Sequence, residues 1–332
     1  MIAHTNIKKT IPLVSVYMTT YNQEAYIGQA IESIVAQECS FSFELIIGED
    51  GSTDNTRAIV EKYAMKYPDI IIAILRDKNI GAAQNSKEVM ERCQGKYLAF
   101  CEGDDYWIGT NRLQKQIDLI QSDENYRAVF THVKWVDKDN NEIGHSEREN
   151  GPIDYRKLLQ VNPIHTCAFL MDRSIETPSM MKIMHKAPYT DYVMFLAAGF
   201  YGKIAYIDET LAAYRRDVGG MHRWTASESS LQRLKILDLF LEDKEFKKMS
   251  FYIKIAKQYL CIHLSRHLSD EKRFLISMKY FGLGLYFTLY VLFAKKEETY
   301  RHINRSELLK IGFFSLPYTK VFYLKFKRLF VS

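Results

Sequence analysis

Several common signals are missing from this sequence of 332 residues. It has only five cysteines and no CxxC pair, which fits neither a disulfide framework nor a zinc site and favours a reducing compartment. No GxGxxG or Walker A motif follows a strand-like run, which argues against NAD binding and against a P-loop. The net charge is only +5, and the basic residues are not interleaved with aromatics in one block, so we expect no nucleic-acid partner.

Long apolar runs are missing as well. The first ten residues, MIAHTNIKKT, contain no apolar segment of the signal-peptide kind, so we expect the chain to stay in the cytoplasm. The uncharged run at residues 280–294 is fifteen residues long, whereas a membrane-spanning helix needs about 20. This run therefore fits either a buried helix or a helix at a membrane surface.

The C-terminal tail has the same two interpretations. It combines the aromatics Phe313, Phe314, Tyr318, Phe322, Tyr323, Phe326 and Phe330 with Lys320, Lys325, Lys327 and Arg328. This composition is typical of a segment on an anionic membrane surface, which would place the protein peripherally at the inner face of the plasma membrane. In the alternative, the aromatics pack on the preceding domain and the lysines are solvated.

Strand-like and helix-like segments alternate in the first third of the chain. Strand-like runs occupy residues 13–20, 43–48, 70–75 and 97–101, with helical spacing of apolar residues between them, and later runs occupy 128–136 and 204–208. The alternation predicts an α/β fold with a mostly parallel sheet and helices on both faces. Because helical patterns follow to the end, we expect a first domain at residues 1–223 and a helical region at 224–332.

Polar clusters follow three of the expected strands. They occupy residues 20–22, 49–54 and 103–105. Ligands of parallel α/β sheets bind beyond the carboxyl ends of the strands, so these clusters should converge on one crevice.

Two adjacent carboxylates, Asp104 and Asp105, end the fourth strand-like run. Like charges at contact distance repel, and a divalent cation between them relieves the repulsion. Hard oxygen ligands suit Mg²⁺ or Mn²⁺, and Mg²⁺ is usually held by one or two carboxylates together with substrate phosphates. For an isolated pair a solvated turn is the alternative, but Gly103 in front of this pair lets the backbone approach a ligand closely.

Three segments together resemble a known family. Residues 14–22 (VSVYMTTYN), 49–54 (EDGSTD) and 103–107 (GDDYW) match, in order and spacing, the inverting glycosyltransferases of family 2, which have the GT-A fold. The resemblance extends over roughly the first 220 residues. It implies transfer of a sugar from a nucleotide-diphosphate carrier, with UDP expected, to an acceptor hydroxyl with inversion.

The resemblance also implies roles for the donor site. Thr19 and Tyr21 match residues that line the nucleotide pocket, and Asp50 matches the carboxylate that reads the base edge. Asp104 matches the acidic residue near the ribose, and Asp105 matches the ligand of a Mn²⁺ or Mg²⁺ ion that bridges the diphosphate.

Further residues match the acceptor side of the family. Asp191 resembles the base that takes the proton from the acceptor hydroxyl. Arg215, Arg216 and His222 resemble a closing loop that contacts diphosphate or acceptor, although Asp217 departs from the expected pattern. Residues 162–166 fit part of an acceptor wall.

Two alternatives remain beside a transferase. A nucleotidyltransferase usually has a loop rich in glycine and cations after its first strand, and residues 20–28 contain no Lys or Arg. A catalytically silent nucleotide-sugar-binding scaffold would bind donor without turnover. For an active enzyme, the family implies a saccharide acceptor, polyprenyl-diphosphate-linked if the tail binds membrane, in assembly of bacterial capsule, O-antigen or exopolysaccharide.

Overall fold

A computed structural model describes residues 11–216, 218, 224–270, 280 and 282–283. The chain divides into two compact units, residues 1–223 and 224–332, each of which is described by itself. His222, almost all of the run at 280–294 and the aromatic tail lie outside the described residues.

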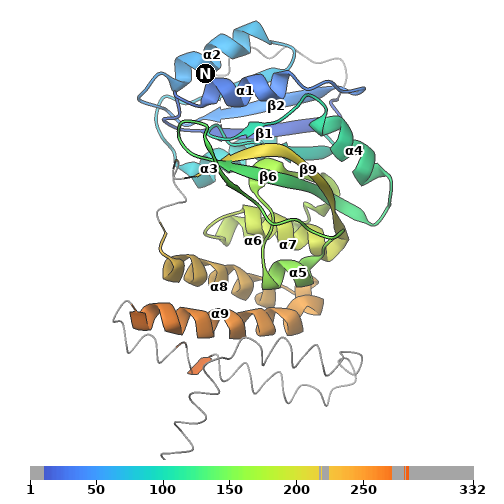
Figure 1. Ribbon diagram of the computed structural model, residues 1–332, viewed down its shortest axis with the longest axis vertical. Helices are drawn as coiled ribbons and strands as arrows, with labels where there is room; N and C mark the ends of the chain where they lie inside the picture. The colour runs from blue at the N-terminus through green and yellow to red at the C-terminus, as the bar shows by residue number, and fades with distance from the viewer. Residues whose placement is uncertain (1–10, 217, 219–223, 271–279, 281, 284–332) are drawn as a thin grey trace, which may run out of the picture. The chain divides into compact units, whose positions relative to one another are not determined.

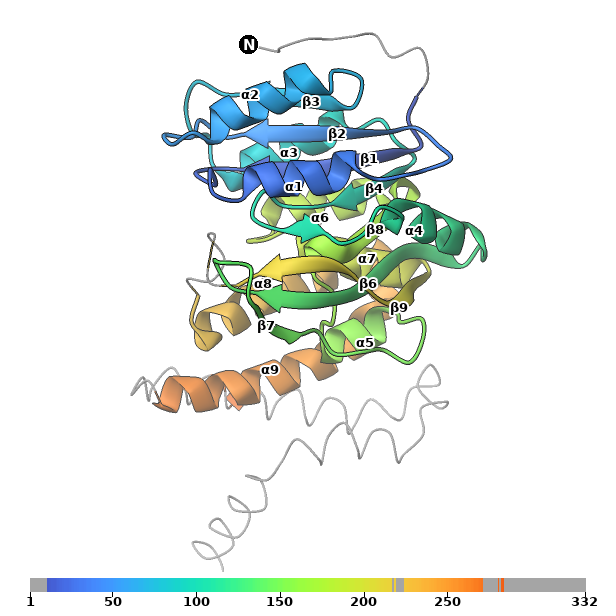
Figure 2. The ribbon, with the colours of Figure 1, turned by 45° about the horizontal axis from the view of Figure 1, so that its top comes forward.

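The first half of the sheet is parallel. It contains β1 (Val14–Thr20), β2 (Phe43–Glu49), β3 (Ile71–Leu75) and β4 (Tyr97–Phe100), in the spatial order β3-β2-β1-β4. The connecting helices are α1 (Ile27–Val35), α2 (Thr56–Lys66) and α3 (Ala82–Arg92). Right-handed crossovers place α1 and α2 on one face and α3 on the other (Figures 1 and 2). Helices on both faces explain why β1 and β4 are apolar and buried nearly throughout.

The second half of the sheet is mixed. Its strands are β5 (Tyr106–Trp107), β6 (Tyr126–Val136), β7 (Glu142–His145), β8 (Phe169–Asp172) and β9 (Lys203–Arg215). β8 is antiparallel to both β4 and β6, and β5 is antiparallel to β9, whereas β6 and β9 are parallel. The prediction of a mostly parallel sheet therefore describes the first four strands better than the rest.

Strand β9 is longer than the sequence pattern indicated. The predicted run ended at residue 208, but the strand continues to Arg215. Asp208 and Glu209 are exposed where the register with β6 shifts, so two charges interrupt the apolar pattern while the strand continues. The extension matters because Arg215 reaches the end of the sheet at which the polar clusters lie.

Four more helices complete the described part of the first unit. They are α4 (Arg112–Gln121), α5 (Tyr155–Gln160), α6 (Pro178–Lys186) and α7 (Asp191–Tyr201). Helix α7 is buried from Tyr192 to Gly199, so its first residue is held firmly. At Gly199 an added Cβ would lie 2.5 Å from the backbone nitrogen of Tyr155, which shows how closely α5 approaches α7.

The second unit is helical where it is described. It contains α8 (Ala226–Glu242), a 3-10 helix at Glu245–Met249 and α9 (Ser250–Asp270). A capping box between Thr225 and Glu228 begins α8, and Phe240 packs edge-on against Phe246 with 4.7 Å between ring centroids. Within the described ranges, the helices are too short or too polar for one to span a bilayer.

Two glycine substitutions should have opposite effects on stability. Gly199→Ala should lower the free energy of unfolding by about 1–3 kcal/mol, because the new methyl group meets the Tyr155 backbone. Gly28→Ala in α1 should raise it by about 0.5–1 kcal/mol, because the nearest atom is 3.8 Å away and alanine favours the helix. Urea unfolding followed by circular dichroism measures both, and equal effects would contradict the close approach at Gly199.

Candidate active site

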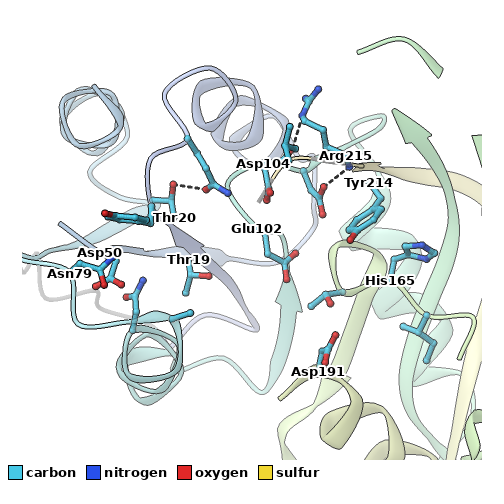
Figure 3. A pocket seen from close by; sticks show the side chains of 18 residues that line it. Thr19, Thr20, Asp50, Asn79, Glu102, Asp104, His165, Asp191, Tyr214 and Arg215 are labelled. Carbon is cyan, nitrogen blue, oxygen red and sulfur yellow. Dashed lines mark hydrogen bonds between the residues drawn. The ribbon is translucent and has the colours of Figure 1, made fainter. Parts of the chain in front are cut away.

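A cavity of about 420 Å³ opens at the carboxyl ends of β1, β2 and β4 (Figure 3). Its lining comes from five parts of the first unit: Thr19, Thr20, Tyr21 and Gln23 at the end of β1 and after it; Asp50 after β2; Asn79, Ala82 and Asn85 around the start of α3; Glu102, Asp104 and Asp105 after β4; and Ile164, His165, Thr166, Asp191, Tyr214, Arg215 and Val218 from segments later in the chain. This is the point where the strand order reverses between β1 and β4, which is where such sheets bind ligands.

Most of the predicted site residues meet in this cavity. The lining includes Thr19, Tyr21, Asp50, Asp104, Asp105, Asp191 and Arg215. Arg216 is not part of the lining, because its guanidinium lies over the Trp135 ring at 4.8 Å from the centroid. His222 lies outside the described residues.

Asp50 organises one end of the cavity. Its side chain is 2% exposed, and its two carboxylate oxygens accept hydrogen bonds from the backbone amides of Ile80 at 2.9 Å and Gly81 at 3.1 Å. Gly81 has φ +90°, a conformation that favours glycine. Asp50 thereby fixes the loop from which Asn79 lines the cavity, which the half-exposed Tyr21 also lines.

The acidic turn is tied to strand β9. Asp105 is 3% exposed, and its Oδ1 accepts a hydrogen bond from the Arg215 backbone amide at 2.7 Å. Burial, followed by the charges of Asp104 and Glu102, raises the pKa of Asp105 well above its usual range. At Gly103 an added Cβ would lie 2.4 Å from the Gln23 side chain, so the turn lies directly against the loop after β1.

Glu102 is a cavity carboxylate that the sequence motifs did not single out. Its Oε2 is buried and has no hydrogen-bond partner within the described part of the chain. Burial raises the pKa of Glu102 to about 8, and the charges of Asp104 and Asp191 add to the effect. The sequence signal for Glu102 was its place in Glu102-Gly103-Asp104, where one acidic residue precedes the glycine and another follows it.

Asp191 enters the cavity from the first turn of α7. The N-cap of this helix is Thr190, so Asp191 is the first helical residue and does not cap the helix. Its Oδ1 accepts a hydrogen bond from the Tyr192 amide at 2.7 Å, and burial raises its pKa although this bond and one with Thr166 oppose the shift. A carboxylate with a raised pKa is a better proton acceptor than an ordinary one.

Aromatic side chains line the cavity beside Asp191. Trp135 donates a hydrogen bond from Nε1 to Nε2 of His165 at 3.1 Å, and Tyr214 packs against the same imidazole with 5.0 Å between centroids. Because Nε2 is an acceptor, the imidazole proton is on Nδ1. Burial, with the nearby charge of Arg216, lowers the pKa of His165 to about 4, so the ring is neutral at physiological pH.

The carboxylates fit a divalent cation that is only partly enclosed by protein. Within the described ranges, no group of three or more His, Cys, Asp or Glu side chains has the arrangement of a complete metal site. The unpartnered oxygen of Glu102, and the rise in its pKa to which the charge of Asp104 contributes, nevertheless indicate that this carboxyl lacks a compensating positive charge. This donor set suits Mg²⁺ or Mn²⁺ if phosphate oxygens complete the coordination.

Fold and cavity together define an α/β protein of the GT-A type. Residues 15–176 match the model of glycosyl transferase family 2. The chain is 34% identical over 210 residues to an uncharacterized protein of Mycobacterium tuberculosis, covering 62% of this chain and 60% of that protein. It is 30% identical over 178 residues to UDP-Glc:alpha-D-GlcNAc-diphosphoundecaprenol beta-1,3-glucosyltransferase WfgD of Escherichia coli, covering 53% and 67%. The chain belongs to glycosyltransferase family 2.

Solved structures support the same fold. Residues 1–349 of Staphylococcus aureus TarS in complex with UDP-GlcNAc align with a TM-score of 0.55 and 20% identity, over 77% of this chain and 72% of that one. The mannosyltransferase PcManGT of Pyrobaculum calidifontis, in complex with GDP-Man and Mn²⁺, aligns with a TM-score of 0.56 and 15% identity, over 98% and 89%. The prediction of a GT-A fold is confirmed.

His165 should stay neutral when acid is added. Its lowered pKa predicts that the ring gains a proton only near pH 4, whereas an unperturbed imidazole does so near about 6.5. Nitrogen-15 NMR of the histidine rings should report Nε2 as the unprotonated nitrogen above that range. In Trp135→Phe the donor to Nε2 is lost, so the tautomer preference should weaken, and a wild-type midpoint near 6.5 would contradict the assignment.

Proposed function

We propose that residues 1–223 form the catalytic domain of an inverting, metal-dependent hexosyltransferase, and that residues 224–332 form an accompanying helical region. The donor is a nucleotide-diphosphate sugar, with UDP as the nucleotide. The observation that supports this most strongly is that one cavity brings together the residues after β1 and β2, the acidic turn after β4 and Asp191. One site therefore contains side chains suited to bind the nucleotide and the diphosphate and a carboxylate that can accept the proton of the acceptor hydroxyl.

The donor lies along the carboxyl ends of the parallel strands. Thr19, Tyr21 and Asp50 hold the nucleoside, with the ring of Tyr21 stacked on the base and Asn79 beside it. Asp104 and Asp105 would hold the Mn²⁺ or Mg²⁺ ion, with the carboxyl of Glu102 near Asp104. The ion, when bound, stabilises the negative charge that develops on the departing diphosphate.

Asp191 acts as the general base. It takes the proton from the acceptor hydroxyl as the oxygen attacks the anomeric carbon, and a single displacement inverts that centre. The buried helix α7 and the neighbouring Thr166 hold its carboxylate in place. Because Asp191 comes from α7 and the proposed metal-binding carboxylates from the turn after β4, the base and the donor carboxylates approach the cavity from different segments (Figure 3).

The acceptor is a saccharide linked to polyprenyl diphosphate. The similarity to WfgD, whose name specifies a diphosphoundecaprenol-linked acceptor, supports this class. The product belongs to cell-surface polysaccharide assembly, such as capsule, O-antigen or exopolysaccharide, and the enzyme works in the cytoplasm at the inner face of the plasma membrane. Arg216, which is exposed but outside the cavity lining, is proposed to contact the diphosphate of donor or acceptor, and His222, which lies outside the described residues, has the same proposed role.

Asp191→Asn should separate donor binding from transfer. The amide keeps the shape of the carboxylate but cannot accept the proton, so transfer should fall by about 10²–10⁴-fold while the affinity for UDP-sugar changes little. Calorimetry with UDP-sugars and a product assay measure the two effects. Asp154→Asn is the matched control, since Asp154 caps α5 outside the cavity and asparagine also caps. Transfer by Asp191→Asn at the wild-type rate would exclude the base role, and a wild type that binds without turnover would favour the silent scaffold.

Asp104→Asn should weaken metal-dependent donor binding. The substitution removes one charge from the acidic turn, so UDP affinity in the presence of Mn²⁺ should fall at least about tenfold, whereas binding without metal should change little. Calorimetry of UDP with Mn²⁺ and with EDTA gives the comparison. Asp118→Asn on the exposed side of α4 should leave both affinities unchanged, and an unaltered Mn²⁺ effect in Asp104→Asn would exclude Asp104 as a ligand.

A further inference from the structure

Arg215 is buried among protein acceptors at the end of β9. Its side chain is 1% exposed, and its Nε donates to the carbonyl oxygen of Asp104 at 2.9 Å. Nη1 donates to the carbonyl oxygen of Asp137 at 2.9 Å, and Nη2 donates to Oε1 of Gln29 at 3.1 Å and to Oδ1 of Asn140 at 2.8 Å. The guanidinium therefore has partners on all three of its nitrogens.

These contacts leave few hydrogen-bond donors of the Arg215 guanidinium available to a phosphate. Four hydrogen bonds use four of the five N–H donors of a guanidinium. The Tyr26 ring, whose centroid is 4.4 Å from the guanidinium carbon, covers one face. Arg215 was predicted to contact diphosphate or acceptor, but its hydrogen bonds favour an action through the residues that it holds.

Those neighbours include both residues of the acidic turn. The Arg215 side chain holds the carbonyl of Asp104, and its backbone amide holds the carboxylate of Asp105 (Figure 3). Any displacement of Arg215 therefore displaces the attachment points of both residues. Neither bond uses the Asp104 carboxylate.

The other ends of the network lie outside the cavity lining. Gln29 belongs to α1, and Asn140 belongs to the turn between β6 and β7. Within that turn, both Asp137 carboxylate oxygens accept hydrogen bonds from Asn141. Asn140 has φ +67°, so the backbone presents its side chain from a left-handed conformation.

We propose that Gln29, Asn140 and Arg215 form a positioning network that sets the geometry of the Asp104–Asp105 turn for the cation and the diphosphate. The inference deepens the proposed function and rests on it. A metal site needs its ligands within about 0.5 Å of the productive geometry, and partners that orient ligands typically change metal affinity about 10–100-fold. Gln29 and Asn140 thus influence donor binding without touching the donor.

Two substitutions remove the remote acceptors with little other change. Asn140→Gly deletes the Oδ1 acceptor at a φ that glycine readily adopts, and Gln29→Met deletes the Oε1 acceptor while keeping the side-chain length. Each should lower the affinity for UDP with Mn²⁺ by about three- to tenfold, and Arg215→Lys, which loses the planar fork, by about 10–100-fold. Calorimetry with EDTA should show little change in any of the three.

A double-mutant cycle shows whether the residues act as one unit. Once Arg215→Lys has removed the fork, adding Asn140→Gly should cause no further loss of Mn²⁺-dependent affinity, because the two substitutions break the same interaction. Arg173→Lys is the matched control: Arg173 also donates to a backbone carbonyl, that of Cys93 at 2.6 Å, but it lies outside the cavity lining. It should lower the unfolding temperature without changing UDP affinity.

The outcomes separate this inference from the proposed function. If the wild type binds neither UDP nor GDP with Mn²⁺ or Mg²⁺, the proposed function is wrong, and the positioning role that rests on it is wrong as well. If the wild type binds but Asn140→Gly and Gln29→Met bind equally well, only the network is overturned. An equal loss of UDP affinity with Mn²⁺ and with EDTA would also overturn the network. Such a loss would indicate general damage to the fold, because an effect on metal binding should appear only when Mn²⁺ is present.

Discussion

The central constraint on this site is the crowding of carboxylates in a poorly solvated cavity. Glu102, Asp104, Asp105 and Asp191 all line it, and burial together with mutual repulsion raises the pKa of Glu102 to about 8. Such an arrangement is unfavourable for a folded chain unless positive charge and hydrogen bonds compensate it. The proposed cation and the observed arginines both supply positive charge that reduces the repulsion between these carboxylates.

Two buried arginines supply the permanent part of that compensation. Arg215 binds the acidic turn through its amide and its guanidinium. Arg112 is fully buried, with its guanidinium 4.0 Å from the Trp107 ring centroid, and it acts electrostatically on Glu102. Burial lowers the pKa of Arg112 to about 10, so it stays charged at neutral pH. These two arginines thus stabilise the acidic turn with contacts from within the chain itself, which favours a preformed geometry at the proposed donor site.

Local patterns were sufficient to predict the parallel half of the sheet. Four buried apolar strands with helices between them specify a parallel sheet, and the sheet alone brings Asp50 and Asp104 to one edge. The patterns failed where the determining contacts are distant in sequence. Glu102 stands out only when the charges of Asp104 and Asp191 lie near it and raise its pKa. Strand β9 continues past two exposed charged residues that interrupt its apolar pattern. The Arg215 side chain binds Gln29, which is 186 positions away in the sequence.

The family match and the geometry support different halves of the site. The match to family 2 ends at residue 176, so it includes Asp50, Glu102, Asp104 and Asp105 but neither Asp191 nor Arg215. The later residues are placed by packing: α7 is buried and begins at Asp191, and β9 pairs with β6 up to Arg215. Because the acidic turn and Asp191 are anchored by separate elements, a substitution that shifts α7 can move the proposed base while the acidic turn keeps its geometry. The Arg215 network joins the two halves, because it fastens the end of β9 to the turn after β4.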